Sequence, residues 1–287
     1  MLERIARPLS GLSSGIAAVV NGFYRVLGRP GKYLQDFLNG SWLGHSLHPV
    51  LTDVVVGGST VAVLLEVLGW FGVSDLRSAI AWTLALASIS ALGTIVTGLT
   101  DYKDTATGNE RNVAGLHGLI NIVATVALIV AFLAYLGPGG TLGPVLLIGG
   151  YLVLSVGAFI GGHVVFKYGY MVNHNAFARG KRAKEFMPVL PAAELAENTP
   201  TRASLGATIL VLVRRGDVVH ALKETCSHAG GPLAQGTLEG DTIVCPWHSS
   251  AFRLSDGAVR HGPAASRQVA YRARINAEQV EVQGPLD

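Results

Sequence analysis

Hydrophobic positions are concentrated in the first part of the chain. Four apolar segments follow one another there, at 50–72, 79–99, 119–136 and 145–165. Each is close to the roughly 20 residues that an α-helix needs to cross a bilayer. The segments at 79–99 and 119–136 contain no charged residue and have no polar face, which argues against helices of a soluble bundle. The pattern therefore predicts a membrane domain of four transmembrane helices packed as a bundle.

The pattern changes after residue 185. Short runs rich in β-branched residues, such as 207–213, 217–221, 242–244 and 279–283, are separated by Gly and Asp turns. This alternation predicts a small antiparallel β-sandwich. The expected fold class is thus a membrane α-bundle followed by an all-β domain. The expected divisions are an N-terminal segment at 1–44, the four-helix domain at 45–170, a linker at 171–185 and the β domain at 186–287.

The N-terminal segment has a mixed character. Residues 12–27 combine apolar positions with Asn21 and Arg25, which is typical either of a helix lying on the bilayer surface or of an unstructured tail.

Composition and charge agree with a membrane protein. Of the 287 residues, 49% are hydrophobic and only 14% are charged. The net charge of +3 is small, and the basic residues are not interleaved with exposed aromatics, so no nucleic-acid partner is expected. Basic residues lie on one side of the predicted spans, and Arg77 alone lies on the other. The positive-inside rule then places both termini and the β domain in the cytoplasm. The basic residues on that side are Arg4, Arg7, Arg25, Arg29, Lys32, Lys103, Arg111, Lys167, Arg179, Lys181, Arg182 and Lys184.

Two cysteines and two histidines form a paired motif in the β domain. Cys226 and His228 are separated by one residue, and Cys245 and His248 by two. Two thiolates and two imidazoles suit either a zinc ion or a [2Fe-2S] cluster. Paired zinc ligands usually have two to four residues between them, so the tighter first pair favours the cluster. The chain has only 2 Cys, and using both as ligands leaves no disulfide.

The residues around this motif carry a family resemblance. They are Gly-Gly-Pro-Leu at 230–233, Ser-Ser-Ala-Phe at 249–252 and Gly-Pro-Ala at 262–264. Together with the paired motif they resemble a Rieske domain of the bacterial ferredoxin type, from about residue 186 to 282. The resemblance implies that Cys226 and Cys245 bind one iron and that His228 and His248 bind the other. It also implies that the loop containing Pro263 covers the cluster.

The sequence departs from the high-potential members of that family. Those proteins place Ser and Tyr two and four residues after the second His ligand, where this chain has Ser250 and Phe252. Hydrogen bonds to the sulfurs raise the reduction potential, so losing one donor predicts a low to intermediate value. Ser249 stands where the family usually has Gly.

Polar residues also occur at the ends of the predicted spans. The run Gly-His-Ser-Leu-His-Pro at 44–49 and the run Thr-Gly-Leu-Thr-Asp-Tyr at 97–102 resemble an uncharacterised bacterial four-span membrane domain that is found fused to Rieske domains. This resemblance places the chain in a bacterial inner membrane. Residues predicted to gather on the cytoplasmic side are His48, Asp53, Asp101, His117 and His163.

Ionisable residues at such positions are functional candidates. Histidines from different helices suit a b-type haem, and a His with an Asp suits a quinone. The alternative is a set of interfacial residues hydrogen-bonded to one another and to lipid headgroups. His174, His220 and His261 are expected to be surface residues.

These features lead to a functional hypothesis. The expected protein is a membrane-anchored Rieske protein that carries single electrons between a membrane component and a cytoplasmic redox partner. The alternative is a quinol- or haem-linked oxidoreductase whose membrane half is itself redox active. An oxygenase component is disfavoured, because too few residues follow His248 for a mononuclear-iron domain.

Overall fold

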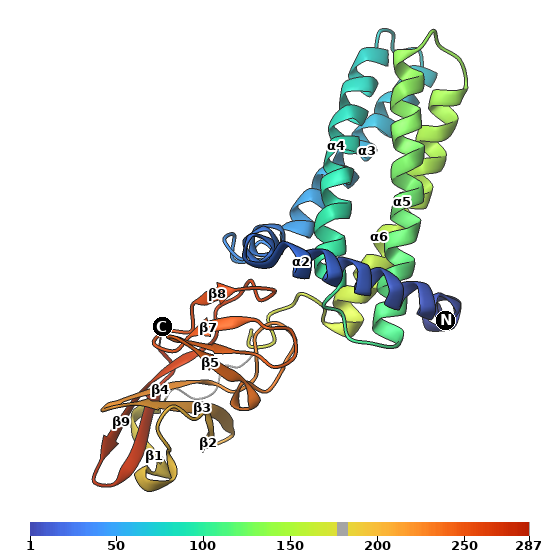
Figure 1. The fold of residues 1–287 in the computed structure, drawn as a ribbon. Helices are drawn as coiled ribbons and strands as arrows, with labels where there is room; N and C mark the ends of the chain where they lie inside the picture. Colours follow the sequence, from blue (N-terminus) through green and yellow to red (C-terminus); the bar gives the residue numbers. More distant parts are fainter. Residues whose placement is uncertain (177–182, 287) are drawn as a thin grey trace. The chain divides into compact units, whose positions relative to one another are not determined.

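The structure is a computed structural model that describes residues 1–176 and 183–286. The chain forms two units (Figure 1). The first contains Met1–Gly31 and Ser46–Tyr170, and the second contains Lys32–His45 and Met171–Asp287.

The first unit is built on four long helices. All four are long and apolar enough to cross a bilayer, which confirms the predicted helical membrane domain. They extend beyond the apolar segments because polar turns continue the helices at their ends. His117, expected to open the third span, therefore lies roughly two turns inside its helix. The helices are α3 (Leu47–Trp70), α4 (Arg77–Tyr102), α5 (Asn109–Leu136) and α6 (Leu142–Tyr168).

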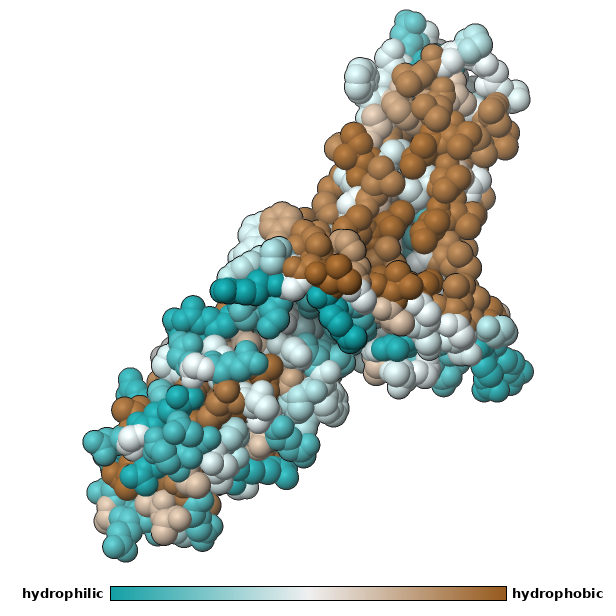
Figure 2. Space-filling model, in the orientation of Figure 1, coloured by the Kyte–Doolittle hydropathy of each residue, from teal (hydrophilic) through white to brown (hydrophobic). Residues whose placement is uncertain are grey.

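Small residues allow these helices to pack closely. A side chain on Gly150 of α6 would meet Ala127 and Leu128 of α5 at 3.1 and 3.3 Å. The interior is filled by fully buried residues such as Leu84 and Leu147. The outward faces carry large exposed hydrophobic residues, and Figure 2 shows apolar colour over much of the visible face of the bundle. Exposed apolar surface with tight glycine contacts is typical of helices packed in lipid.

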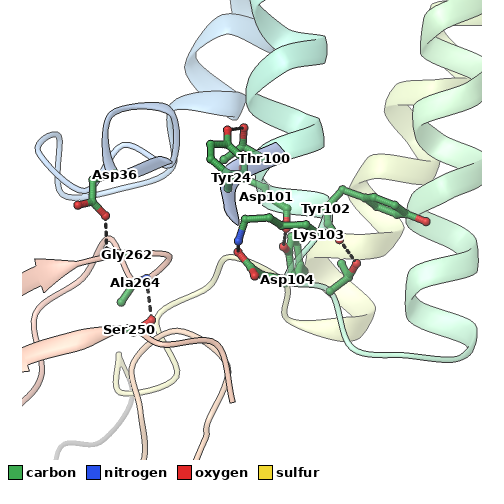
Figure 3. A network of polar contacts seen from close by, with 12 residues as sticks. Tyr24, Asp36, Thr100, Asp101, Tyr102, Lys103, Asp104, Ser250, Gly262 and Ala264 are labelled. Carbon is green, nitrogen blue, oxygen red and sulfur yellow. Dashed lines mark hydrogen bonds and ion pairs between the residues drawn. The ribbon is translucent and has the colours of Figure 1, made fainter. Parts of the chain in front are cut away.

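The N-terminal segment is helical. It consists of α1 (Leu2–Ala6), a short 3-10 turn at Arg7–Leu9 and α2 (Ser10–Leu38). Gly28 interrupts α2 with φ 58° and ψ −130°, values that glycine adopts without steric cost. Before this break, the Tyr24 hydroxyl lies 2.6 Å from that of Thr100 in α4 (Figure 3). The helical interpretation of 12–27 is therefore correct, and the unstructured tail is wrong.

The second unit is an antiparallel β domain, as predicted. One sheet has six strands in the order β1-β10-β9-β4-β3-β2, and the other has four in the order β5-β6-β7-β8. One apolar core includes Leu210, Leu212 and Val280, and another surrounds Cys226 and Cys245. The strands are β1 (Ala183–Pro191), β2 (Thr201–Leu205), β3 (Thr208–Arg215), β4 (Val218–Lys223), β5 (Thr237–Glu239), β6 (Thr242–Val244), β7 (Ala251–Arg253), β8 (Val259–His261), β9 (Ala270–Asn276) and β10 (Gln279–Gly284).

Part of the predicted linker is built into this β unit. The His174 N–H donates to the Ser227 carbonyl at 3.0 Å, and the Asn175 amide donates to the Thr225 carbonyl at 2.9 Å. These bonds join the start of the linker to the loop that carries Cys226 and His228. Residues 177–182 of the linker, with Arg179, Lys181 and Arg182, lie outside the described residues.

Candidate metal centre

The first ligand loop follows β4 and carries Cys226 and His228. The Cys226 N–H donates to the Gly231 carbonyl at 2.9 Å, and the Gly230 N–H donates to the Cys226 carbonyl at 3.0 Å. Gly231 is required here for space, because a Cβ at this position would lie 2.7 Å from Cys245 Sγ. The loop is thus closed tightly against the sulfur of the second loop.

The second ligand loop connects β6 to β7 and carries Cys245 and His248. The Cys245 N–H donates to the Ser250 carbonyl at 2.9 Å, and the Ser249 N–H donates to the Cys245 carbonyl at 3.1 Å. Ser249 has φ 62°, in the left-handed region that favours glycine. A glycine at this position would adopt the same backbone without the steric cost that a serine carries.

The two loops bring one thiol and one imidazole each to the same place. The rings of His228 and His248 are 5.0 Å apart between centroids and nearly perpendicular, at 89°. Cys226 and Cys245 are buried, and their thiols are hydrogen-bonded to each other. The structure therefore gathers all four residues of the sequence motif.

Backbone N–H groups surround the two sulfurs. Those of His228 and Ala229 point at Cys226, and those of Trp247 and His248 point at Cys245. The pKa of Cys245 is lowered to about 7, first because it accepts a hydrogen bond from Cys226 and then because these amides donate to it. The pKa of Cys226 is raised because it donates that bond and is buried. The surroundings thus favour negative charge on the Cys245 sulfur and disfavour a second negative charge on the Cys226 sulfur.

This donor set suits an iron–sulfur cluster better than a single metal ion. Within residues 1–176 and 183–286, no three His, Cys, Asp or Glu side chains converge on one ion position. A structural zinc ion needs four such ligands. A cluster of the Rieske type takes only two protein ligands on each iron, and amides facing the sulfurs are among the features that tune it.

Three further residues, Ser250, Phe252 and Pro263, were predicted to surround the cluster. Ser250 is fully buried, and its hydroxyl oxygen accepts a hydrogen bond from the Ala264 N–H at 3.0 Å (Figure 3). Phe252 is fully buried in the same apolar core as the two cysteines. Pro263 lies in the segment at 262–264, here called the proline loop, and Ser250 thereby connects the second ligand loop to it.

A further contact to the proline loop was missed by the sequence reasoning. The Asp36 carboxylate accepts from the Gly262 N–H at 2.7 Å (Figure 3), and its other oxygen lies 2.7 Å from His261 Nδ1. A Cβ on Gly262 would lie 2.8 Å from Ser41 Oγ. Residues 32–45, here called the N-terminal brace, therefore belong to the metal-centre unit.

Nothing in the local sequence signals this contact, since Asp36 and Gly262 are separated by 226 positions. His261, expected to be a surface residue, keeps a side-chain exposure of 40% but has Asp36 as a partner.

The polar residues of the membrane unit do not form one cluster. His48 and His117 lie side by side, with ring centroids 6.3 Å apart. Asp101 accepts a hydrogen bond from the Ser46 hydroxyl at 2.9 Å, and the His163 ring packs against Tyr168. Asp53 is exposed on α3. Of the predicted set, only the first two histidines are brought into mutual contact.

Comparison with known proteins agrees with this architecture. Residues 185–275 match the family model of the Rieske [2Fe-2S] domain, and residues 44–174 match a family described as predicted membrane protein (DUF2231). The chain is 31% identical over 100 residues to ferredoxin CarAc of Metapseudomonas resinovorans, which covers 34% of this chain and 94% of that protein. It is 30% identical over 98 residues to the anthranilate 1,2-dioxygenase ferredoxin subunit of Burkholderia cepacia, covering 34% and 91%.

Longer relatives share only this domain. Apoptosis-inducing factor 3 of Mus musculus is 32% identical over 78 residues, which are 27% of this chain but 13% of that protein. The fold and these matches define a Rieske-type iron–sulfur protein with a membrane domain. The chain belongs to the Rieske [2Fe-2S] family, and its β domain is a ferredoxin-type domain homologous to electron-transfer ferredoxins.

Proposed function

We propose that this protein is a membrane-anchored electron carrier. In this proposal Cys226 and Cys245 bind one iron of a [2Fe-2S] cluster, and His228 and His248 bind the other. The observation that carries it is the convergence of one thiol and one imidazole from each of two loops, with backbone amides facing both sulfurs. When bound, the cluster supplies reversible transfer of one electron.

The cysteine side of the proposed cluster site is buried, whereas the histidine side is partly exposed. Cys226 and Cys245 are 0% and 3% exposed, so the sulfurs are removed from water. His248 is only partly buried, and the neighbouring Trp247 is 56% exposed. A redox partner that docks on this edge would approach the iron bound by histidine. We therefore place the route of electron exchange at His248.

The proposal extends to location and partner. The basic residues flanking the helices favour a cytoplasmic position for both termini and for the β domain, at 186–287, with the bundle at 45–170 in a bacterial inner membrane. The reducing cytoplasm suits a Rieske domain that has no disulfide. One of the ferredoxin relatives is by name a subunit of a dioxygenase, which supports a cytoplasmic redox protein as the partner.

A second candidate function is a membrane oxidoreductase in which the bundle itself takes part in electron transfer, through haem or quinone. The observation that favours it is the contact between His48 and His117 inside the helical unit.

The cluster is tested by metal analysis and EPR of the detergent-purified, full-length protein. We expect two irons and two acid-labile sulfides per chain, and a dithionite-reduced EPR spectrum typical of histidine ligation. His228→Ala should abolish that spectrum. His220→Ala, a histidine of β4 outside both ligand loops, is the matched control and should leave it unchanged. Stoichiometric zinc without iron after anaerobic purification would contradict the proposal.

A further inference from the structure

Two histidines of the membrane unit occupy equivalent positions in two helical hairpins. His48 Nδ1 of α3 lies 3.0 Å from the Thr94 carbonyl of α4, and His117 Nδ1 of α5 lies 2.8 Å from the Gly157 carbonyl of α6. Four residues after each carbonyl comes a glycine, Gly98 in α4 and Gly161 in α6. The same local arrangement is therefore built twice.

The repetition continues along the helices that carry the histidines. Four residues after His48, the Thr52 hydroxyl donates to the His48 carbonyl at 2.9 Å. Four residues after His117, the Asn121 amide donates to the His117 carbonyl at 2.7 Å. In both helices a polar side chain thus occupies the turn that follows the histidine.

Both glycines make room for an imidazole. A Cβ on Gly98 would lie 2.8 Å from His48 Cε1, and a Cβ on Gly161 would lie 2.7 Å from His117 Cε1. Such distances are too short for carbon atoms in contact. Each ring is therefore pressed against the backbone of the neighbouring helix, in a place that only glycine leaves open.

The carbonyl contacts fix the tautomer of each ring. A carbonyl oxygen can only accept, so Nδ1 carries the proton and Nε2 carries the lone pair. Asn121 Nδ2 also lies 3.1 Å from His117 Nδ1, but the shorter contact to the Gly157 carbonyl requires the proton on Nδ1, so the Asn121 amide donates only to the His117 carbonyl, at 2.7 Å. A histidine whose Nδ1–H is held by a backbone carbonyl is oriented as metal-ligating histidines usually are.

The imidazole rings of His48 and His117 lie next to each other in an edge-to-face arrangement. Their centroids are 6.3 Å apart and their planes cross at 78°. A metal ion held by one nitrogen of each ring at about 2 Å, between the rings, would place the ring centres roughly 6 Å apart. Both residues are only partly buried, so part of their surface is available to a ligand.

The number of protein ligands favours haem over a bare metal ion. In the described parts of the chain, no third His, Cys, Asp or Glu joins these two around one ion position. A bare zinc ion would lack half of its usual four ligands. A haem iron already has four nitrogens from the porphyrin and needs only axial ligands from the protein. We propose that His48 and His117 are the two axial ligands of a haem in the membrane unit.

This site, combined with the proposed function, gives the cluster a one-electron partner in the same chain. The bundle is then more than an anchor, since it supplies the membrane component that exchanges electrons with the cluster. The haem proposal itself depends only on the geometry of the helical unit.

The test uses the full-length protein, expressed with added hemin and purified in detergent. We expect one haem per chain by pyridine haemochrome assay, and the optical spectrum of a low-spin haem with two nitrogen ligands. His48→Ala and His117→Ala should each lower haem content at least tenfold. His117→Met, which keeps an axial ligand, should retain haem with a shifted spectrum. His163→Ala should retain haem with an unchanged spectrum.

Glycine variants separate loss of a ligand from loss of fold. Gly161→Ala should displace the His117 ring and lower haem content severalfold. Gly149→Ala, in the same helix with no atom within 4 Å of its added Cβ, should leave haem content unchanged. For every variant, the cluster EPR signal is recorded as a reporter of the folded β unit, and helix content by circular dichroism as a reporter of the folded helical unit.

Three outcomes would overturn the haem site. They are a wild-type protein with an intact cluster signal but no haem, haem retained in both His→Ala variants, or a bare metal ion in place of haem that both variants lose. A protein that binds haem at this site but has no cluster would overturn the proposed function and leave the haem site standing.

Discussion

The chain holds two pairs of histidines in two different ways. His228 and His248 stand on short loops whose shape is set by local backbone hydrogen bonds, and one of these loops includes a residue at φ 62°. His48 and His117 stand on regular helices, and their rings are placed by a carbonyl and a glycine of a neighbouring helix. The ring centroids are 5.0 Å apart in the first pair and 6.3 Å in the second.

This difference predicts different responses to mutation. A loop site is adjustable, because surrounding residues can tighten or loosen it in small steps. A helix site has little freedom, because the backbone is regular and closely packed, so an added methyl group displaces the ring or the helix. Substitutions around the cluster should therefore change its stability and reduction potential in small steps. Substitutions at Gly98 and Gly161 should instead cause an abrupt loss of the proposed haem site.

The largest graded effect is expected from the N-terminal brace. Asp36→Ala removes the acceptor of the buried Gly262 N–H and the partner of His261. Losing a charged hydrogen-bond partner costs about 1.5–3 kcal/mol. The temperature at which the visible absorbance of the cluster is lost should fall by roughly 10 °C, given about 4–8 °C per kcal/mol for a domain of this size.

Asp36→Asn is the matched control for this prediction. It keeps an acceptor for the Gly262 N–H and loses only the charge next to His261, so its effect should be less than half as large. Equal midpoints for wild type and both variants would show that the brace does not stabilise the cluster.

A smaller effect is expected on the reduction potential. The Ser250 oxygen accepts from the Ala264 N–H, so its own hydrogen remains to be donated toward the cluster. Ser250→Ala should lower the potential by roughly 60 mV, the one-electron equivalent of about 1.4 kcal/mol. Phe252→Tyr adds a hydroxyl in the core that contains both cysteines and should raise it by a similar amount. Potentials unmoved in both variants, measured by EPR-monitored titration, would show that solvent exposure sets the value.

The features that could be predicted from the sequence are those specified by residues close together in the chain. The Cys-His motif is short, so the four residues that converge in the structure are visible in a few neighbouring positions, whereas the left-handed backbone at Ser249 is seen only in the structure. The four helices are visible because lipid requires long apolar segments. The contacts of the N-terminal brace with the proline loop, and those of His48 with Gly98 and His117 with Gly161, join residues that are distant in sequence. No local sequence pattern specifies these contacts. The gathering of five polar residues in the membrane unit was expected from span ends alone, but side-chain direction on each helix brings only two of them together.

The smallest effect tests whether the loop site carries backbone strain at all. Ser249 has φ 62°, where a side chain costs an L-residue about 1–2 kcal/mol relative to right-handed backbone and costs glycine little. Glycine also gains freedom in the unfolded chain, which offsets part of the benefit. Ser249→Gly should therefore raise the midpoint of thermal cluster loss by only a few degrees. Ser249→Ala keeps the Cβ and should leave the midpoint unchanged. A lower midpoint for the glycine variant would mean that the serine side chain stabilises the loop by more than its backbone costs, and the contrast with the unstrained helix site would then disappear.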